Sequence, residues 1–403
     1  MLDSKLRLAV VADFAEELWP SMDLVADALF DRLRAERSDQ VEPVLIRPRF
    51  KRRFTLAATA GERQGLGRAR FNADRLLNRF FDYPRHLRRV RDNFDIFHIT
   101  DHSYAHLVRQ VAQARAIVTC HDLDAFRVVL EPSMTPYPGR LIAGPLRMMA
   151  ASGIRGLRSA AMVACDSGTT RDELLRYRVV EAQRTITIPM GVAPVFSALP
   201  DAQADAKAAR MLGPSGPETL EILHVGSTIA RKRIDVLLGA FAAIREAHPA
   251  ARLLRVGGPF TADQTRLARE LRLDVATVEL PFVNSEVLAA IYRRAAMVLI
   301  TSEREGFGLP MIEAMACGAP MIASDLAVLR EVGGRAAQFA AVGDIPAWTA
   351  ASLGLIRERS DDPVCCTARR AEGLAQAAGF SWSETARRYV ELYRQVANGD
   401  RGL

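Results

Sequence analysis

Short apolar runs alternate along the chain with longer segments of helical periodicity. This alternation is typical of βαβ units, because parallel strands that are covered on both faces are apolar almost throughout. The pattern therefore predicts an α/β protein built on parallel sheets. It predicts strands at residues 6–12, 41–46, 95–99, 116–120, 161–164, 185–189, 220–225, 252–256, 278–282, 297–301 and 321–323.

The alternation breaks between Phe196 and Pro217, where the sequence becomes rich in Ala, Pro and Gly. A chain of 403 residues is long for a single core. We therefore predict two doubly wound domains, residues 1–195 and 218–380, joined by a linker at 196–217. The last segment, 381–403, has its apolar residues at helical spacing and is predicted to be an amphipathic helix.

The composition narrows the class of protein. The fractions of hydrophobic residues (49%) and charged residues (25%) are those of a soluble globular protein. No apolar run reaches the ~20 residues of a membrane span, and the first residues contain no extended apolar signal region. We therefore expect a cytoplasmic protein. The five cysteines lack C-x-x-C spacing, which argues against a disulfide framework or a zinc site.

The positive charge is concentrated in one segment. Residues Arg47–Arg91 contain 14 Lys/Arg and 3 acidic residues, an excess of +11, whereas the whole chain has a net charge of +7. The rest of the chain is therefore net negative, at −4. This segment predicts attraction to an anionic acceptor or, peripherally, to the anionic inner face of a membrane. A solvated basic face on a core-packed helix is the alternative. Nucleic acid is disfavoured, since no base-stacking or helix-turn-helix pattern accompanies the charge.

The most informative motif is the run SEREGFGLPMIEAMACGAP, in which Glu305 and Glu313 stand eight residues apart. Gly306 and Gly308 follow the first glutamate, and a proline then suits the first turn of a helix. The free amides of a helix N-terminus form an anion site, and glycines let a ligand approach the backbone. A carboxylate beside an anion site fits a ligand that has both phosphates and hydroxyls, as a nucleotide sugar has.

This run resembles the E-x7-E signature of the retaining glycosyltransferases of family GT4. The match includes EGFGLP, EAMACGAP and the later Ser324-Asp325 and Glu331-Val332. An isolated pair of glutamates would more readily mark a buried helix after a glycine turn, but each matched neighbour favours the family. The resemblance implies the GT-B fold, in which two Rossmann-like domains face across a cleft and a final helix crosses back to the N-terminal domain. Packing of that helix on the second domain is the alternative.

The resemblance also implies site residues in the second domain. Glu305 is expected to bind the transferred sugar and to be catalytic, and Glu313 is expected to bind the ribose. The residues expected to bind the donor are Gly226, Ser227, Arg231, Lys232, Glu305, Gly306, Phe307, Gly308, Leu309 and Glu313.

Arg231 and Lys232 follow a predicted strand and precede a predicted helix, where parallel α/β sheets hold their ligands. They resemble the Arg-Lys pair of the family's donor-phosphate segment, and we expect both to be catalytic by stabilising the departing diphosphate. Many members carry an arginine directly after the glycine, where this chain has Ser227. A solvated charge run is the alternative, but cations at a helix start are opposed by the helix dipole.

His121 comes directly after a buried strand, in TCHDL, which resembles the family's strand-His-Asp segment. The resemblance implies that His121 is catalytic and reaches the donor sugar or the reacting centre; a satisfied core histidine is the alternative. Asp122 and Asp124 also spell D-x-D, a metal motif of another glycosyltransferase class. We expect no metal and no other cofactor, because Arg231 and Lys232 supply the charge that a metal would supply. After the next strand, Ser167 is predicted to cap a helix.

Together these features predict a retaining hexosyltransferase-like enzyme that moves a sugar from a nucleoside-diphosphate donor to a hydroxyl acceptor. The acceptor stays open between a glycan, a lipid-linked sugar and a small molecule, because the chain after its first strand lacks the family's glycine-rich loop. The alternatives are a non-catalytic nucleotide-sugar-binding protein and a nucleotide-sugar epimerase or hydrolase on the same architecture.

Overall fold

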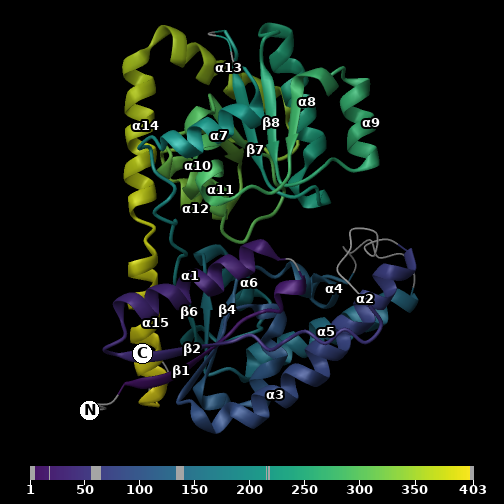
Figure 1. The fold of residues 1–403 in the computed structure, drawn as a ribbon, viewed down its shortest axis with the longest axis vertical. Coiled ribbons are helices and arrows are strands. Elements are labelled where there is room, and N and C mark those ends of the chain that lie inside the picture. The colour runs from purple at the N-terminus through teal and green to yellow at the C-terminus, as the bar shows by residue number, and fades with distance from the viewer. Residues whose placement is uncertain are drawn as a thin grey trace. The chain divides into compact units, whose positions relative to one another are not determined.

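The computed structural model describes residues 5–17, 19–55, 65–132, 140–214, 216 and 218–399. The chain divides into two compact units. The first comprises Met1–Met190 and Trp382–Leu403, and the second comprises Gly191–Ser381. Each unit contains a parallel six-stranded sheet flanked by helices, as the apolar pattern predicts (Figure 1).

The sheet of the first unit has the strand order β2-β1-β3-β4-β5-β6. Its strands are apolar almost throughout, since helices cover both faces. They are β1 (Leu6–Val11), β2 (Val41–Ile46), β3 (Ile96–Ile99), β4 (Ala116–Cys120), β5 (Met162–Cys165) and β6 (Thr185–Thr187). The helices are α1 (Pro20–Glu36), α2 (Gly65–Leu77), α3 (Tyr83–Val90), α4 (Arg127–Leu130), α5 (Arg140–Ser159), α6 (Gly168–Arg176) and α15 (Trp382–Ala397).

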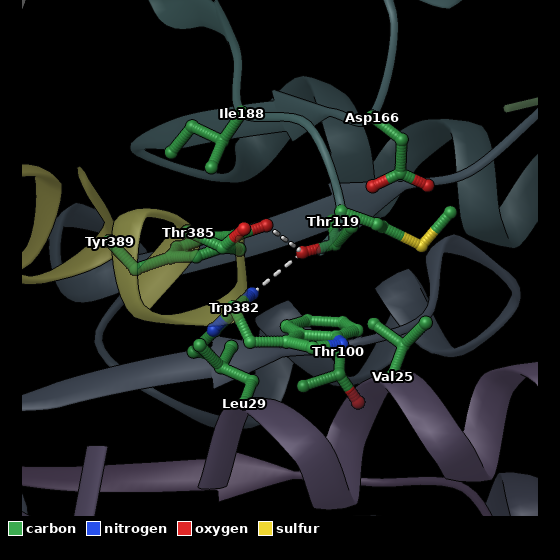
Figure 2. Close-up of a pocket in the computed structure, with 11 residues that line it drawn as sticks. Val25, Leu29, Thr100, Thr119, Asp166, Ile188, Trp382, Thr385 and Tyr389 are labelled. Atoms are coloured by element: carbon green, nitrogen blue, oxygen red, sulfur yellow. Dashed lines mark hydrogen bonds between the residues drawn. The ribbon is translucent and has the colours of Figure 1, made fainter. Parts of the chain in front are cut away.

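The C-terminal helix α15 packs on the sheet of the first unit through a buried polar network. His98 of β3 bonds the Tyr393 hydroxyl at 2.8 Å and the Thr119 hydroxyl at 2.7 Å, and Thr119 also bonds the Tyr389 hydroxyl at 2.7 Å. A small cavity of ≈ 10 Å³ lies between α1, α15 and the sheet, lined in part by Trp382 and Asp166 (Figure 2). The polar partners fix the register of α15 on the sheet, because a buried polar group is costly without a partner.

The sheet of the second unit has the order β12-β11-β10-β7-β8-β9. Its strands are β7 (Glu221–Val225), β8 (Arg252–Val256), β9 (Thr277–Leu280), β10 (Met297–Ile300), β11 (Met321–Ser324) and β12 (Gln338–Ala340). The helices are α7 (Ala202–Leu212), α8 (Ile234–Ala247), α9 (Ala262–Glu270), α10 (Ser285–Arg294), α11 (Leu309–Ala316), α12 (Ala327–Gly333), α13 (Ile345–Asp361) and α14 (Pro363–Ala378).

Two features of the second unit differ from the sequence prediction. The segment 196–217, predicted to be a linker, contains helix α7, which Asp201 caps and which buries Ala204, Ala208 and Leu212. Alanine is too weakly hydrophobic for this stripe to stand out by periodicity, although it is the best helix former. Strand β12 was not predicted, because it has only three residues and only one of them is buried.

The basic segment of the first unit differs from the core-packed helix that was the alternative to a binding surface. Helices α2 and α3 are joined by a π-helical turn at Asn78–Asp82, and Pro84 lies in the first turn of α3, where proline is tolerated. Leu87 is buried. Four hydrophobic side chains that a core-packed helix would bury are instead exposed: Leu76, Leu77, Phe80 and Phe81.

Candidate functional site

Each sheet reverses its strand order at one point, and in the second unit the polar residues predicted from the sequence flank that point. In the second unit the reversal lies between β7 and β10, which are adjacent in the sheet. Ligands of open α/β sheets bind at the carboxyl ends of the strands beside such a point. The segment after β7 carries Arg231 and Lys232, and the segment after β10 carries Glu305.

The turn after β7 is shaped by glycine. Gly226 has φ 154°, a value that side chains disfavour. A Cβ on Gly257, which follows β8, would lie 2.1 Å from the Gly226 carbonyl oxygen, so only glycine fits there. Arg231 and Lys232 then lie in a 3₁₀ turn immediately before α8. The two turns therefore present backbone and cations together at one edge of the sheet.

Glu305 connects the two segments. Its carboxylate lies 2.6 Å from the Lys232 ammonium and 3.4 Å from the Arg231 guanidinium, and accepts a hydrogen bond from the Ser302 hydroxyl at 2.7 Å. Burial opposes ionisation, but Lys232 and Arg231 lower the pKa of Glu305. Glu305 is therefore a buried carboxylate that holds both cations in place. Thr301 contributes by donating to the Lys232 carbonyl at 2.9 Å.

Glu313 has a different environment, one turn into α11. The Tyr292 hydroxyl of α10 donates a hydrogen bond to its carboxyl group at 3.0 Å. Burial raises the pKa of Glu313 to about 7, although the hydrogen bond from Tyr292 opposes the shift. Near neutral pH the carboxyl therefore exists in both protonation states and can both donate to and accept from hydroxyl groups.

This shifted pKa predicts a pH-dependent stability. The folded protein retains a proton on Glu313 that the unfolded chain releases, so stability falls as pH rises from about 4.5 to about 7, by about 3 kcal/mol in total. We expect Glu313→Gln, which mimics the protonated acid, to unfold like the parent at pH 4.5 and to be more stable at pH 8. Urea unfolding at both pH values measures this. An equal effect at both would contradict the assignment.

The glycine-rich loop between Glu305 and α11 is tightly packed. Gly308 caps α11 with φ 100°, and a Cβ there would lie 2.9 Å from a Leu329 methyl group. The Phe307 ring is buried edge-on against Phe380, with centroids 5.6 Å apart. Phe307, one of the predicted donor-binding residues, therefore uses its side chain for packing, which leaves its backbone as the part that can face a ligand.

The remaining predicted donor-binding positions lie at the same two turns. Ser227 follows Gly226 and is half-buried, and Leu309 begins α11 and is also half-buried. Gly306 is buried in the loop after Glu305. The structure thus brings the Gly226–Lys232 and Glu305–Leu309 segments to the same edge, whereas Tyr292, Ser302 and Thr301 were not predicted. Ser302 and Thr301 could have been suggested by their position after a strand, whereas Tyr292, in the last turn of α10, carries no such signal.

In the first unit, a buried polar residue follows each of four strands. Asp13 follows β1, Asp101 follows β3, His121 follows β4 and Asp166 follows β5. Burial and then the nearby Asp101 carboxylate raise the pKa of Asp13 well above its usual range. The carboxyl edge of this sheet therefore holds a dense set of ionisable groups, as the edge of the second sheet does.

His121 is held from both sides within the first unit. Its Nδ1 lies 2.5 Å from the Asp166 carboxylate, and its Nε2 lies 2.7 Å from the Thr100 carbonyl oxygen. Two acceptors on one ring require both nitrogens to carry protons. Burial opposes this charge, but Asp166 and Asp101 raise the pKa of His121 to about 9. A direct role at the donor sugar stays a prediction, and it requires the Nε2 bond to open.

The His121–Asp166 pair predicts a second pH effect. Because the folded pKa of His121 is raised, the pair stabilises the protein fully below pH 6.5 and this stabilisation is lost as pH rises through about 9. We expect Asp166→Asn to lower the free energy of unfolding by about 3–5 kcal/mol at pH 6.5 and by much less at pH 10. The exposed Asp172→Asn on α6 is the control. A difference that does not shrink with pH would refute the charged pair.

The helix cap and the D-x-D motif singled out in the sequence both lie in the first unit. Ser167 caps α6 by accepting from the Thr170 amide at 3.1 Å, as predicted. The two carboxylates of the D-x-D motif are engaged locally: Asp122 accepts from the Asp124 amide at 2.9 Å, and Asp124 accepts from Arg127 at 3.1 Å. Within the described ranges of the chain, no group of three or more His, Cys, Asp or Glu residues could hold a metal ion.

Two parallel α/β units of this kind make up the GT-B fold of glycosyltransferases. Solved structures resemble the whole chain. A sucrose-phosphate synthase from Thermosynechococcus elongatus has a TM-score of 0.69 and 21% identity, covering 97% of this chain and 99% of its own. Anabaena HepE, solved with UDP and glucose, has a TM-score of 0.68 and 14% identity, covering 97% and 100%. At these identities the likeness shows the fold.

The chain belongs to glycosyltransferase family 4. The model for "Glycosyltransferase Family 4" matches residues 27–195, and that for "Glycosyl transferases group 1" matches residues 219–358. A D-inositol 3-phosphate glycosyltransferase from Catenulispora acidiphila is 29% identical over 78% of this chain and 75% of its own length. One from Segniliparus rotundus is 30% identical over 70% of this chain, but the match spans only 61% of that relative. O-antigen chain mannosyltransferase B from Escherichia coli is 28% identical over 70% of each.

Proposed function

We propose that this glycosyltransferase moves a sugar from a nucleoside-diphosphate donor to a hydroxyl acceptor, with retention of the anomeric configuration. The observation that carries the proposal is the cluster of Arg231, Lys232 and Glu305 at the switch point of the second sheet. Two cations fixed by one carboxylate leave a net positive charge where a diphosphate would bind. HepE, of the same fold, was solved with UDP-glucose, which supports this class of donor.

Each residue of the cluster has a proposed role in this reaction. Arg231 and Lys232 bind the diphosphate and stabilise the negative charge that grows on it as the bond to the sugar breaks. Glu305 orients both cations and faces the transferred sugar, and Glu313 bonds the ribose hydroxyls. The backbones of Gly226–Ser227 and Gly306–Leu309 approach the donor closely, since glycine at these turns removes the Cβ.

Retention follows in this proposal from attack on the face that the diphosphate leaves. The bond from the anomeric carbon to the diphosphate oxygen breaks, and the acceptor oxygen bonds to the same face. The acceptor proton passes to the leaving diphosphate oxygen. No covalent glycosyl intermediate is invoked, because Glu305 is already committed to two cations.

The experiment is a transfer assay with UDP-, GDP- and ADP-sugars, with the anomeric product identified by NMR. We expect one donor to support transfer with retention and to do so in excess EDTA, because Arg231 and Lys232 replace a metal. Activity that is abolished by EDTA and restored by Mn²⁺ would contradict the metal-free proposal and favour a site at Asp122 and Asp124. An inverted product would contradict retention.

We further propose that the acceptor carries phosphate or another anionic group. The relatives from Catenulispora acidiphila and Segniliparus rotundus are named for D-inositol 3-phosphate. The basic segment Arg47–Arg91 supplies a matching positive charge, although ion pairs with carboxylates of the same chain neutralise part of this charge. Lys51 and Arg53 pair with Asp82, and Arg75 and Arg79 pair with Glu17.

The same segment supports reversible attachment to an anionic membrane. Exposed hydrophobic side chains, Phe80 and Phe81 among them, stand in the same helical stretch as the exposed Arg85 and Arg88. Such a combination of basic and apolar side chains favours binding at a lipid interface. No helix in the described parts of the chain is long and apolar enough to cross a bilayer.

Co-sedimentation with liposomes tests this attachment. We expect binding to vesicles with anionic lipid at low salt and loss of binding at high salt, because the Debye length is about 10 Å at 0.1 M. At about 1 kcal/mol per basic residue near the surface, Arg85→Glu with Arg88→Glu should weaken binding at least tenfold. The control is Arg266→Glu with Arg269→Glu, an exposed pair of the same spacing on α9. Equal effects of the two pairs, or no binding at low salt, would overturn the membrane proposal.

A further inference from the structure

Arg255, near the carboxyl end of β8 in the second sheet, is a buried arginine that has no role in the reaction proposed above. It lies on β8, in register with His224 on β7 and Glu279 on β9. Its relative exposure is 0%, so the guanidinium is out of contact with bulk water. Burying a charged group removes its hydration and lowers the stability of the fold unless another interaction compensates.

The guanidinium joins the two glycine turns of the candidate site. Its Nη2 donates to the Gly226 carbonyl at 2.9 Å, and its Nη1 donates to the Gly258 carbonyl. The central guanidinium carbon lies 5.1 Å from the centroid of the Phe260 ring. These carbonyls belong to the turns that end β7 and β8 at the ligand edge of the sheet. Arg255 therefore holds the backbones of both turns in place through one hydrogen bond to each turn.

The charge of Arg255 is not balanced by an ion pair with any residue that the structure describes. No carboxylate of the described residues lies within ion-pair distance of it, and its Nε has no hydrogen-bond partner. Glu279, its neighbour in register, is exposed and its carboxylate accepts from the Phe260 amide at 2.6 Å. Burial lowers the pKa of Arg255, which Glu279 only partly opposes. A buried cation without a partner favours the binding of an anion nearby.

The side chains around Gly226 indicate that the anion would bind at the Gly226 and Gly258 turns, beside Arg255. The Lys232 side chain lies 3.6 Å from the position that a Cβ on Gly226 would take, and the His224 ring lies 3.5 Å from it. Arg231, Lys232 and Glu305 together carry one net positive charge. Arg255 raises the total to two, which equals the charge of a diphosphate with one negative charge on each phosphate.

We propose that Arg255 is a positioning residue for the donor diphosphate: it orders the Gly226 and Gly258 turns and supplies, from beneath them, the buried positive charge that the diphosphate balances. This rests on the proposed function, because it deepens the role of the same site. Arg255 acts through the two turns and need not touch the donor. The consequence is selective: it strengthens binding of the diphosphate and not of the nucleoside.

The test compares Arg255→Met, which keeps the volume and removes the charge, with Arg255→Lys, which keeps the charge. Calorimetry measures the Kd of whichever of UDP, GDP and ADP the parent protein binds, and of its nucleoside. We expect Arg255→Met to raise the Kd of the nucleoside diphosphate at least tenfold and the Kd of the nucleoside less than threefold. Arg255→Lys should retain diphosphate affinity within about threefold. If Arg255→Met does not fold, Arg255→Gln replaces it, since it is neutral and keeps a donor for one carbonyl.

A matched control comes from the same strand. Arg252, at the other end of β8, also donates to a backbone carbonyl, that of Leu212, but it has a counter-ion in Glu221 at 3.4 Å. Arg252→Met should lower stability without changing the ratio of diphosphate to nucleoside affinity. Equal losses for diphosphate and nucleoside in Arg255→Met, or equal losses of diphosphate affinity in Arg255→Met and Arg255→Lys, would overturn the proposal and leave a structural role. Failure of the parent protein to bind any nucleoside diphosphate would instead refute the proposed function.

Discussion

Replacing both Arg231 and Lys232 by alanine should lower kcat for sugar transfer by about 10³-fold or more. Removal of a single group that stabilises developing negative charge typically lowers kcat by about 10²–10³-fold, and here two such groups are lost together. Their fixed position, 3.4 and 2.6 Å from the Glu305 carboxylate, means that no reorganisation is needed as the diphosphate departs. Steady-state kinetics with saturating donor measures the effect.

The double variant also leaves Glu305 buried without a cation, which lowers stability. Circular dichroism at the assay temperature must therefore show that the double variant is folded before its kcat is compared with that of the parent. Arg357→Ala with Arg359→Ala, two exposed arginines on α13, is the matched control and should leave kcat unchanged. A kcat within tenfold of the parent in the folded double variant would exclude these cations from the reaction.

Glu305→Gln should lower kcat by about 10²-fold without weakening the binding of nucleoside diphosphate. The substitution releases Arg231 and Lys232 from the carboxylate that orients them, and misplaced stabilising groups reduce turnover steeply. It also removes a negative charge beside the diphosphate, so the Kd should stay the same or decrease. Kinetics and calorimetry on one preparation separate these two effects.

Glu303→Gln is the control for Glu305→Gln, because Glu303 lies two residues away in the same loop with a 37% exposed side chain. It should leave both kcat and Kd unchanged. If Glu305→Gln weakens the binding of nucleoside diphosphate by the same factor as it lowers kcat, then Glu305 contributes to binding before the reaction. Its proposed role in the transition state would then be wrong.

The sheets could be predicted because their strands are short, apolar on both faces and separated by helical periods. Val41–Ile46, Ala116–Cys120 and Arg252–Val256 were predicted with the bounds that the structure has. Helix α7 was missed because its buried stripe consists mainly of alanine, and β12 because an edge strand of three residues has little apolar surface. Both failures have one cause: the burial that stabilises these elements depends on neighbours distant in sequence.

The residues of the candidate site also fall into those that the sequence could predict and those that it could not. Arg231 and Lys232 were predicted because they follow a strand and precede a helix, and Glu305 was predicted from the E-x7-E run. The topology of the sheet brings the two segments together. The residues that complete the site could not be predicted. Tyr292 reaches Glu313 from the last turn of α10. Arg255 resembles any other charged residue until the structure shows that it is buried and that no described carboxylate pairs with it. Burial and pairing of single polar groups are properties of tertiary packing.

The proposed function depends most directly on a diphosphate binding at the cluster of Arg231, Lys232 and Glu305. Titration calorimetry with UDP, GDP and ADP, alone and as sugar conjugates, is the measurement. We expect one nucleoside diphosphate to bind in EDTA with a Kd that rises at least tenfold in the Arg231→Ala, Lys232→Ala double variant, whereas the nucleoside alone binds both proteins equally. Binding that is absent from the parent protein, or that is unchanged in the double variant, would contradict the proposed donor site.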